Sequence, residues 1–260
     1  MADAPILECR GVSKSFGAVK ALQDVDFEVR RGEVMALVGD NGAGKSTLIK
    51  GIAGIHPFDE GEVRFEGAPV HIREPKDASA LGIEFVYQDL ALADNLDVVA
   101  NMFLGRERLR NRLLLDEASM EKDARTTLDG LSVTTLKSVR QAVSGLSGGQ
   151  RQAVAVAKSV MWNSKVVILD EPTAALGVAQ TRQVLDLVRR LAEKDLAVVI
   201  ISHNLHDIFE VADRITVLRL GKRSALFARR DVSEEDVVRA ITAGTIERVP
   251  GMTPEPGASA

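Results

Sequence analysis

One short segment limits what this chain can fold into more than any other. Residues 39–47 contain the pattern G-x-x-x-x-G-K-[ST], and they follow the continuous apolar run Val34–Val38. Such a run is typical of a strand buried on both faces of a parallel sheet, and residues Lys45–Ile55 have the pattern of a helix. A strand, a glycine-rich loop and a helix in this order predict a phosphate-binding loop in an α/β fold. The loop residues expected to contact the ligand are Gly39, Asp40, Asn41, Gly42, Ala43, Gly44, Lys45, Ser46 and Thr47.

The residue types in this loop fit the chemistry of a nucleotide. Glycines allow backbone N–H groups to turn inward around phosphate oxygens, and the positive end of the following helix points at the same anion. Lys45 is expected to reach the β- and γ-phosphates of ATP, and the Ser46 hydroxyl is expected to ligate Mg²⁺. The alternative is a chance match, and the position between a buried strand and a helix argues against it.

A pair of acidic residues ends a second buried strand. Asp170 and Glu171 follow the apolar run Val166–Leu169, and ligands of open α/β sheets bind at the carboxyl ends of the strands. Asp170 is expected to hold Mg²⁺, mostly through water, and Glu171 is expected to polarise the attacking water as general base. The alternative is a strand that simply ends in two solvated charges.

A Leu-Ser-Gly-Gly-Gln segment has two interpretations. Ser147 and Gln150 form the capping-box pattern S-x-x-Q ahead of a helix expected at 152–161. A capping box does not need two glycines, whereas Gly148 and Gly149 would expose backbone N–H groups at a helix N-terminus, where anions bind. Two anion sites far apart in one sequence suggest that each ATP is shared between two copies of the chain.

Together these motifs resemble those of an ABC transporter ATP-binding protein, over about residues 6–230. The resemblance implies an α/β P-loop ABC ATPase fold with a mostly parallel core sheet, an antiparallel β subdomain and an inserted α-helical subdomain. Lys45 and Ser46 match the Walker A positions of the family. Asp170 and Glu171 match its Walker B aspartate and catalytic glutamate.

The resemblance also implies roles for further positions. The segment 146–150 is similar to the signature loop of the family, which implies that Ser147, Gly148, Gly149 and Gln150 bind the ATP of a partner subunit. Gln88 matches the Q-loop glutamine, which senses Mg²⁺ and the membrane partner, and His203 matches the switch histidine that contacts the γ-phosphate. Phe16 stands where the family places an aromatic side chain on adenine, usually Tyr; the alternative for Phe16 is a core residue. Gly177 stands where the D-loop usually has Asp, a departure that concerns coupling between subunits, unless it is a tolerated variation.

Four stretches resemble the ATPases of ribose-, xylose- and fructose-type importers, at residues 82–92, 101–107, 202–205 and 212–215. Many such importers carry two ATPase halves in one chain, so a chain with one half implies a homodimer. The implied partners are ATP, a second copy, integral-membrane permease subunits and, indirectly, a sugar-binding protein. The implied function is ATP hydrolysis coupled to monosaccharide uptake, at the cytoplasmic face of the membrane.

Two other classes of function stay open at this point. One is a soluble, non-transport ABC ATPase that acts in assembly or repair; the single ATPase half and the modest helical insert argue against its translation-factor and coiled-coil DNA kinds. The other is a module that holds ATP without turnover. The presence of Glu171 and His203 argues against that module.

The pattern of the whole chain predicts one domain over residues 1–249. Helical spacing replaces strand runs at about 92–161, which predicts a helical subdomain there. Residues 250–260, rich in proline and small residues, are expected to be disordered. The remaining expected elements are a helix at 179–193 and strands at Ile6–Val12, Val25–Val29, Val63–Phe65, Pro69–Ile72, Ala197–Ile201 and Ile215–Leu218.

Composition limits the remaining possibilities. The formal net charge of −4 gives no global basic field, so no nucleic-acid partner is expected. The basic run Arg106–Arg112 is interpreted as a solvated helix end or loop. Cys9 is the single cysteine and cannot form an intramolecular disulfide, which suits a reducing compartment. No apolar run approaches the roughly 18 residues of a membrane span, and no signal peptide is recognised, so a cytoplasmic protein is expected.

Overall fold

The computed structural model describes residues 4–111, 113–133 and 135–243, and a six-stranded sheet forms the centre of this part. The order of its strands is β12 (Lys222–Ala228), β11 (Arg214–Arg219), β3 (Val34–Val38), β10 (Ala197–Ile201), β9 (Val166–Asp170) and β6 (Ile83–Val86). Neighbouring strands are parallel from β11 to β6, and only β12 runs antiparallel to its neighbour. The prediction of a mostly parallel α/β sheet is confirmed.

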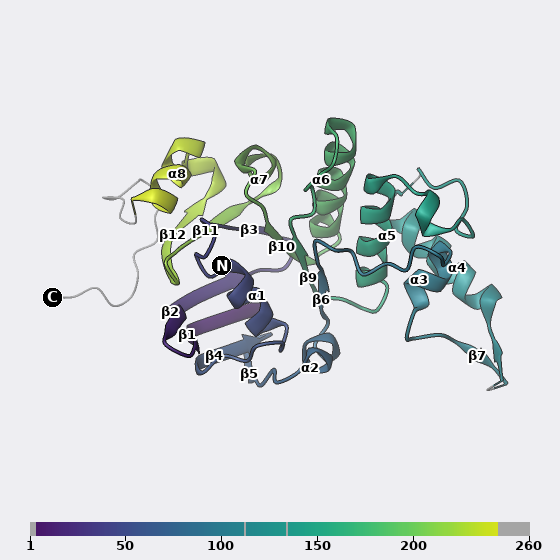
Figure 1. The fold of residues 1–260 in the computed structure, drawn as a ribbon, viewed down its shortest axis with the longest axis horizontal. Coiled ribbons are helices and arrows are strands. Elements are labelled where there is room, and N and C mark those ends of the chain that lie inside the picture. The colour runs from purple at the N-terminus through teal and green to yellow at the C-terminus, as the bar shows by residue number, and fades with distance from the viewer. Residues whose placement is uncertain (1–3, 112, 134, 244–260) are drawn as a thin grey trace.

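A second, antiparallel sheet lies beside the first (Figure 1). Its order is β2 (Val19–Val29), β1 (Leu7–Phe16), β4 (Glu60–Phe65) and β5 (Ala68–Val70). A third sheet is a hairpin of two short strands, β7 (Leu109–Arg110) and β8 (Leu114–Leu115).

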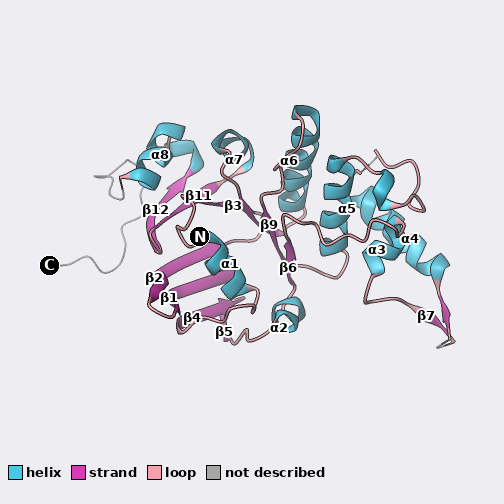
Figure 2. Ribbon diagram, viewed as in Figure 1, coloured by secondary structure: helices cyan, strands magenta, loops and turns pink. Residues whose placement is uncertain are grey.

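Eight α-helices complete the described residues (Figure 2). They are α1 (Lys45–Ile52), α2 (Pro75–Ala80), α3 (Val98–Phe103), α4 (Glu117–Gly130), α5 (Gly148–Val160), α6 (Val178–Glu193), α7 (Leu205–Val211) and α8 (Glu234–Thr242), with short 3₁₀ turns at Val143–Gly145 and Arg229–Asp231. Within the part of the chain described, no helix combines the length and the apolar character that crossing a bilayer requires.

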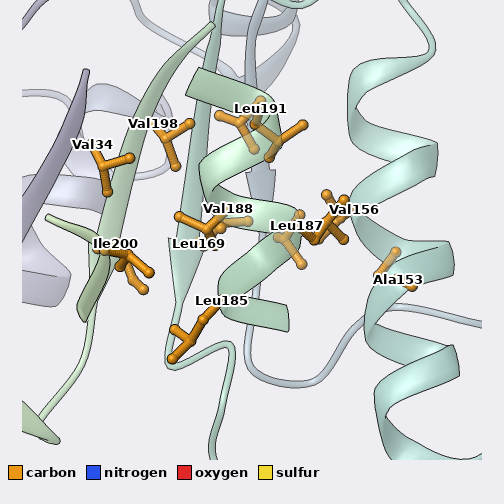
Figure 3. Close-up of a cluster of buried hydrophobic side chains, with 14 of the residues drawn as sticks. Val34, Ala153, Val156, Leu169, Leu185, Leu187, Val188, Leu191, Val198 and Ile200 are labelled. Atoms are coloured by element: carbon orange, nitrogen blue, oxygen red, sulfur yellow. The ribbon is translucent and has the colours of Figure 1, made fainter. Parts of the chain in front are cut away.

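Strands β3 and β10 are apolar throughout, and β9 is apolar up to Asp170, as suits a sheet whose two faces are both covered. Alternate side chains of β3 enter different hydrophobic clusters: Val34 and Ala36 lie in one, and Met35 and Leu37 lie in the other. The second cluster is formed with α1 and the antiparallel sheet. The first is formed with α3 to α8, and Leu187, Val188 and Leu191 of α6 contribute to it (Figure 3).

Helices α3, α4 and α5 lie together on one side of the molecule, next to α6 (Figure 1). Met120, Ala124 and Leu128 on α4 are buried at helical spacing, and Val98 and Met102 on α3 join the same cluster. This packing holds α5 against α3, α4 and α6, and the Leu-Ser-Gly-Gly-Gln segment lies at the start of α5.

Three expectations differ from the structure. The helix expected to reach Ile55 ends at Ile52, because Gly54 takes a φ of 72° in a place where a Cβ would lie 2.6 Å from the backbone of Glu74. The expected absence of strands within 92–161 is wrong, since the β7–β8 hairpin lies there. The helix expected to start at Gln152 begins at Gly148. The segment 250–260 lies outside the described residues.

Strands β6 and β12 were not expected. Residues 83–86 are a short, partly polar stretch, and only their pairing with β9 makes them a strand of the sheet. The other expected strands and the helix at 179–193 are confirmed, with bounds that differ by a few residues in most cases.

Candidate functional site

A pocket of about 560 Å³ lies at the carboxyl ends of the central strands. The glycine-rich loop follows β3. Asp170 is the last residue of β9, Glu171 comes directly after it, and His203 lies shortly after β10. Because these strands are parallel and adjacent, their ends meet at one edge of the sheet. The pocket is lined by Val19, Lys20, Ala21, Asn41, Gly42, Ala43, Gly44, Lys45, Ser46, Thr47, Gln88, Asp170, Glu171, Ile201, His203, Leu220 and Gly221.

The backbone of the loop needs glycine at its two ends. A Cβ on Gly39 would lie 2.3 Å from the carbonyl oxygen of Leu218, and Gly39 has a φ of 151°. Gly44 has a φ of 106°, and a Cβ there would lie 2.9 Å from the carbonyl oxygen of Ala21. Both positions therefore exclude a side chain, and the loop turns directly into α1.

The first turn of α1 is available to an anion. Gly44 is its N-cap and supplies no side-chain cap, and no acidic residue lies in the first turn. The free N–H groups and the helix dipole therefore present a positive end to the pocket. This is the arrangement in which helix N-termini bind phosphate.

The ammonium of Lys45 is held by the loop itself. Its Nζ donates to the carbonyl oxygens of Gly39 at 2.6 Å and Asp40 at 3.0 Å. Burial lowers the pKa of Lys45, and the nearby carboxylates of Glu171, Asp40 and Asp170 oppose that shift. Gly39 and Asp40 were expected to contact the ligand, but they do not line the pocket, and their carbonyls instead hold Lys45.

Asp170 and Glu171 place two carboxylates side by side at the end of β9. Burial raises the pKa of Asp170, and the charge of Glu171 raises it further, while Lys45 and Lys50 oppose the shift. Glu171 has a φ of 50°, a conformation that is costly for a side-chain-bearing residue and is found often at functional sites. Its N–H donates to the carbonyl oxygen of Ile201 at 2.9 Å, which fixes this turn against β10.

His203 is paired with Glu171. The imidazole Nδ1 lies 2.8 Å from Oε2 of the carboxylate. The Glu171 side chain is 17% exposed and the His203 side chain is 77% exposed, so Glu171 is the inner member of the pair and His203 faces solvent. The exposed ring leaves Nε2 of His203 available to a ligand.

The donor set suits Mg²⁺. Ser46, Gln88 and Asp170 all line the pocket and offer a hydroxyl, an amide oxygen and a carboxylate, the oxygen ligands that this ion prefers. A cation beside Asp170 would also relieve the repulsion from Glu171 that raises the pKa of Asp170. Within the described ranges, no cluster of three or more His, Cys, Asp or Glu side chains could hold a metal ion.

The Leu-Ser-Gly-Gly-Gln segment lies elsewhere. Ser147 is the N-cap of α5, and a capping box is present: Oγ of Ser147 accepts from the N–H of Gln150 at 3.3 Å, and Oε1 of Gln150 accepts from the N–H of Ser147 at 2.9 Å. Neither these residues nor Gly148 and Gly149 line the pocket around Lys45. The capping interpretation is correct. The cap uses the Ser147 hydroxyl only as an acceptor, so its proton stays free for the other interpretation, which is binding of an anion.

Phe16 is not a core residue, because it is 44% exposed. It ends β1, pairs with Val19 across the hairpin, and packs edge-to-face against His56, with 5.3 Å between ring centroids. Val19 lines the pocket and Phe16 does not. The aromatic ring therefore stands at the rim rather than inside the pocket.

Six residues of the pocket were not expected. Ile201 ends β10, next to the strand that carries Asp170. Val19, Lys20 and Ala21 come from the start of β2, and Leu220 and Gly221 come from the turn between β11 and β12. A hydrogen bond from the N–H of Gly221 to the carbonyl of Ala43 at 3.0 Å holds that turn against the loop. The residues of β2 and of this turn carry no local motif, and only the tertiary packing of the two sheets brings them to the site.

Gly177 is the N-cap of α6. Its N–H donates to the amide oxygen of Gln180 at 3.4 Å, and a Cβ at this position would meet nothing within 4 Å. An aspartate would therefore fit here and could cap the helix. Nothing in the structure explains why position 177 is glycine.

Comparisons with known proteins place this geometry beside a family and its relatives. The family model described as ABC transporter matches residues 22–174. The chain is 49% identical to a fructose import ATP-binding protein of Rhizobium meliloti, covering 93% of this chain and 95% of that one. It is 47% identical to a xylose/arabinose import ATP-binding protein of Sulfolobus acidocaldarius, covering 94% and 96%. A ribose import ATP-binding protein of Rhizobium meliloti is 41% identical over 96% of this chain, which spans 48% of that longer relative.

Solved structures share the fold. A nucleotide-free ATP-binding cassette of an ABC transporter superposes with a TM-score of 0.78 at 27% identity, covering 92% of this chain and 96% of that one. An ATP-binding cassette in its ADP conformation gives the same TM-score of 0.78 at 29% identity, covering 91% and 98%.

Proposed function

The chain belongs to the ABC transporter family as an ATP-binding ATPase, and from this premise we propose that it powers uptake of a monosaccharide through a separate permease. The observation that carries the proposal is the single pocket that holds Lys45, Asp170 and the Glu171–His203 pair at one edge of the sheet. Binding groups for a triphosphate and a base for water thus occupy the same space.

Nucleotide binding uses the loop and the helix behind it. The N–H groups from Gly42 to Thr47 surround the phosphates, and Lys45 exchanges its two carbonyl partners for phosphate oxygens. Phe16 at the rim stacks on the adenine. Ser46, Gln88 and Asp170 would hold Mg²⁺, which supplies charge neutralisation at the β- and γ-phosphates.

Hydrolysis uses the pair at the end of β9. Glu171 orients the attacking water and accepts its proton, and the left-handed backbone at this residue aims the carboxylate into the pocket. His203 donates from one ring nitrogen to Glu171 and leaves the other for the γ-phosphate. Rate acceleration comes from positioning and from stabilisation of the developing charge.

A homodimer completes each site. Ser147, Gly148 and Gly149 start a helix outside the pocket of their own chain, with the Ser147 proton and two glycine N–H groups free for an anion. In a two-fold dimer they contact the γ-phosphate held by Lys45 of the partner. Closing on ATP and opening after hydrolysis then moves the permease through the region of Gln88 and α3.

The relatives support the substrate class and the cellular place. They are named as fructose, xylose/arabinose and ribose import ATP-binding proteins, so a monosaccharide is the cargo supported for this chain. The permease spans the membrane, a sugar-binding protein delivers the sugar, and this chain works at the cytoplasmic face.

Uptake of labelled fructose, xylose and ribose by cells of the source organism tests this function. One strain carries the Glu171→Gln substitution in the chromosomal gene, and a control strain carries Glu210→Gln, on the exposed side of α7. We expect the Glu171→Gln strain to lose uptake of at least one sugar and the control strain to keep it. Normal uptake of all monosaccharides in both strains, with ATP hydrolysis intact in the wild-type protein, would instead favour a non-transport ATPase acting in assembly or repair.

A further inference from the structure

The β7–β8 hairpin carries four exposed leucines. Leu109, Leu113, Leu114 and Leu115 have exposures of 57%, 86%, 70% and 52%. The hairpin extends away from the helices around it, at the lower right of the view in Figure 1. Leucines gathered on a protruding tip are unusual, because surface leucines are normally scattered, and a gathered group marks a surface that another molecule covers.

The leucines lie on both faces of the hairpin. Leu109 pairs with Leu115, and Arg110 pairs with Leu114, in antiparallel register. Side chains of opposite residues share a face and alternate along the strand, so one face carries Leu109 and Leu115 and the other carries Leu114. A flat protein surface would cover only one of these faces. An interface that surrounds the tip would cover both.

Two arginines that precede the hairpin hold its base against the neighbouring helices. The guanidinium of Arg106 lies 5.1 Å from the ring centroid of Trp162. Arg108 bonds Asp123 at 2.6 Å and lies over Phe103. These contacts hold the hairpin in place on the side of α3 and α4.

Positive charge continues to the tip. Arg110 is exposed and has no ion-pair partner within the described residues. The sequence from 106 to 115 contains four arginines and a single acidic residue, Glu107. Arg106 pairs with Glu84 at 3.5 Å and Arg108 with Asp123, so Arg110 is the described arginine of this segment whose charge no nearby carboxylate offsets.

We propose that the β7–β8 hairpin inserts its leucines into the interfacial region of an anionic lipid bilayer while Arg110 binds lipid phosphates. Two-sided apolar exposure favours a fluid interface over a protein groove, and the unpaired Arg110 complements anionic headgroups. The inference rests on the proposed function, since a permease brings this chain close to the membrane. The hairpin begins six residues after α3, the region proposed to contact that permease.

The test is sedimentation of the purified full-length chain with vesicles, in the absence of any permease. Phosphatidylcholine vesicles containing phosphatidylglycerol are compared with pure phosphatidylcholine vesicles. The variants are Leu113→Ser/Leu114→Ser and Arg110→Glu. Their controls are Val238→Ser, an exposed apolar residue of α8, and Arg230→Glu, an exposed arginine. Thermal melting and ATP turnover in solution confirm that each protein is folded.

The wild type and both controls are expected to bind the anionic vesicles, more weakly as salt increases. The double leucine variant should lose binding about tenfold, because apolar side chains leave the interface, and Arg110→Glu should lose roughly tenfold by charge reversal. Equal binding of hairpin variants and controls would overturn the inference. A wild-type protein that hydrolyses ATP but does not bind vesicles would also overturn the inference. The proposed function would not be affected by that result. A photoreactive group at position 114 that crosslinks in native membranes only to protein would also overturn the inference and identify a protein contact instead.

Discussion

Nδ1 of His203 lies 2.8 Å from Oε2 of Glu171, across the gap between the ends of β10 and β9. The two strands are neighbours in parallel register, with Ile201 opposite Asp170, so the residues that follow them are brought together by the sheet. The contact orients the carboxylate that we propose as general base and holds the imidazole toward the open side of the pocket.

Replacing His203 by Ala should slow ATP hydrolysis strongly. The variant loses both the contact with Glu171 and the ring nitrogen left for the phosphate, so kcat should fall about a hundredfold while nucleotide binding changes little. His206→Ala is the matched control, because His206 lies on α7 and does not line the pocket. Steady-state phosphate release and binding of a fluorescent ATP analogue measure the two effects. Equal rates for the two variants would contradict the role of His203.

Ser147→Ala should affect stability and ATP-dependent dimerisation, whereas Ser233→Ala should affect stability alone. Both serines are N-caps with a full capping box, on α5 and α8. Each substitution should lower the free energy of unfolding by about 1 kcal/mol. Only Ser147 is proposed to contact the nucleotide of a partner, so only its loss should weaken ATP-dependent dimerisation. Urea unfolding and analytical ultracentrifugation separate these outcomes, and equal dimerisation of the two variants would restrict Ser147 to its capping role.

Asp170→Asn should make the protein more stable near neutral pH. Burial and the charge of Glu171 raise the pKa of Asp170 in the folded state, so the native protein holds its proton more tightly than the unfolded chain does. Stability then falls as pH rises from the ordinary aspartate pKa through the raised one. The amide removes this loss, so the variant should melt higher at pH 7, and the difference should vanish at acidic pH.

Asp77 provides a control in which the pKa is lowered by folding rather than raised. Hydrogen bonds from the backbone N–H groups of Arg73 and Glu74 lower the pKa of Asp77. Its contribution to stability is present above the ordinary aspartate pKa and is lost as pH falls through the lowered one, so Asp77→Asn should melt lower at pH 7. Melting curves across the acidic range measure both. An Asp170→Asn variant that melts below the wild type at pH 7 would contradict the repulsion between Asp170 and Glu171.

Arg214 links β11 to the segment before β3 and to β2. Its side chain is 13% exposed, bonds Glu28 at 2.6 Å, and contacts Glu33 through a second guanidinium nitrogen at 3.1 Å. Burial disfavours its charge, but the carboxylates of Glu33 and Glu28 outweigh burial and raise its pKa.

Arg214→Met should therefore cost about 3 kcal/mol of unfolding free energy, because it leaves Glu33 uncompensated in a buried place. Arg125→Met removes an exposed i,i+4 pair with Glu121 and should cost less than about 1 kcal/mol. Urea denaturation compares the two. Equal losses would show that the network of Arg214 is no stronger than a surface pair.

Much of this site was predictable because its groups sit at fixed offsets from strands with strong local signals. The apolar runs of β3, β9 and β10 are unbroken, so the residues after them had to meet at one edge of a parallel sheet. That rule places Lys45, Asp170, Glu171 and His203 in one pocket without any knowledge of side-chain contacts.

The remaining features depend on packing between distant segments. Lys20 and Gly221 enter the pocket only because the β1–β2 hairpin and the β11–β12 turn pack against the loop. Strand β6 has only four residues, with Glu84 among them, and is too short to be recognised without its partner β9. The β7–β8 hairpin has two residues in each strand and lies among helices, so from the sequence alone the basic run Arg106–Arg112 is interpreted as a solvated helix end or loop.

The rate of phosphate release by Glu171→Gln, measured beside its affinity for ATP, tests the central claim most directly. The amide keeps the size of the side chain and its place against His203, but it cannot accept a proton from water. We predict that kcat falls at least a hundredfold while ATP binding is retained and the ATP-bound dimer accumulates. A variant that binds ATP and hydrolyses it at the wild-type rate would show that Glu171 is not the base and would contradict the proposed mechanism.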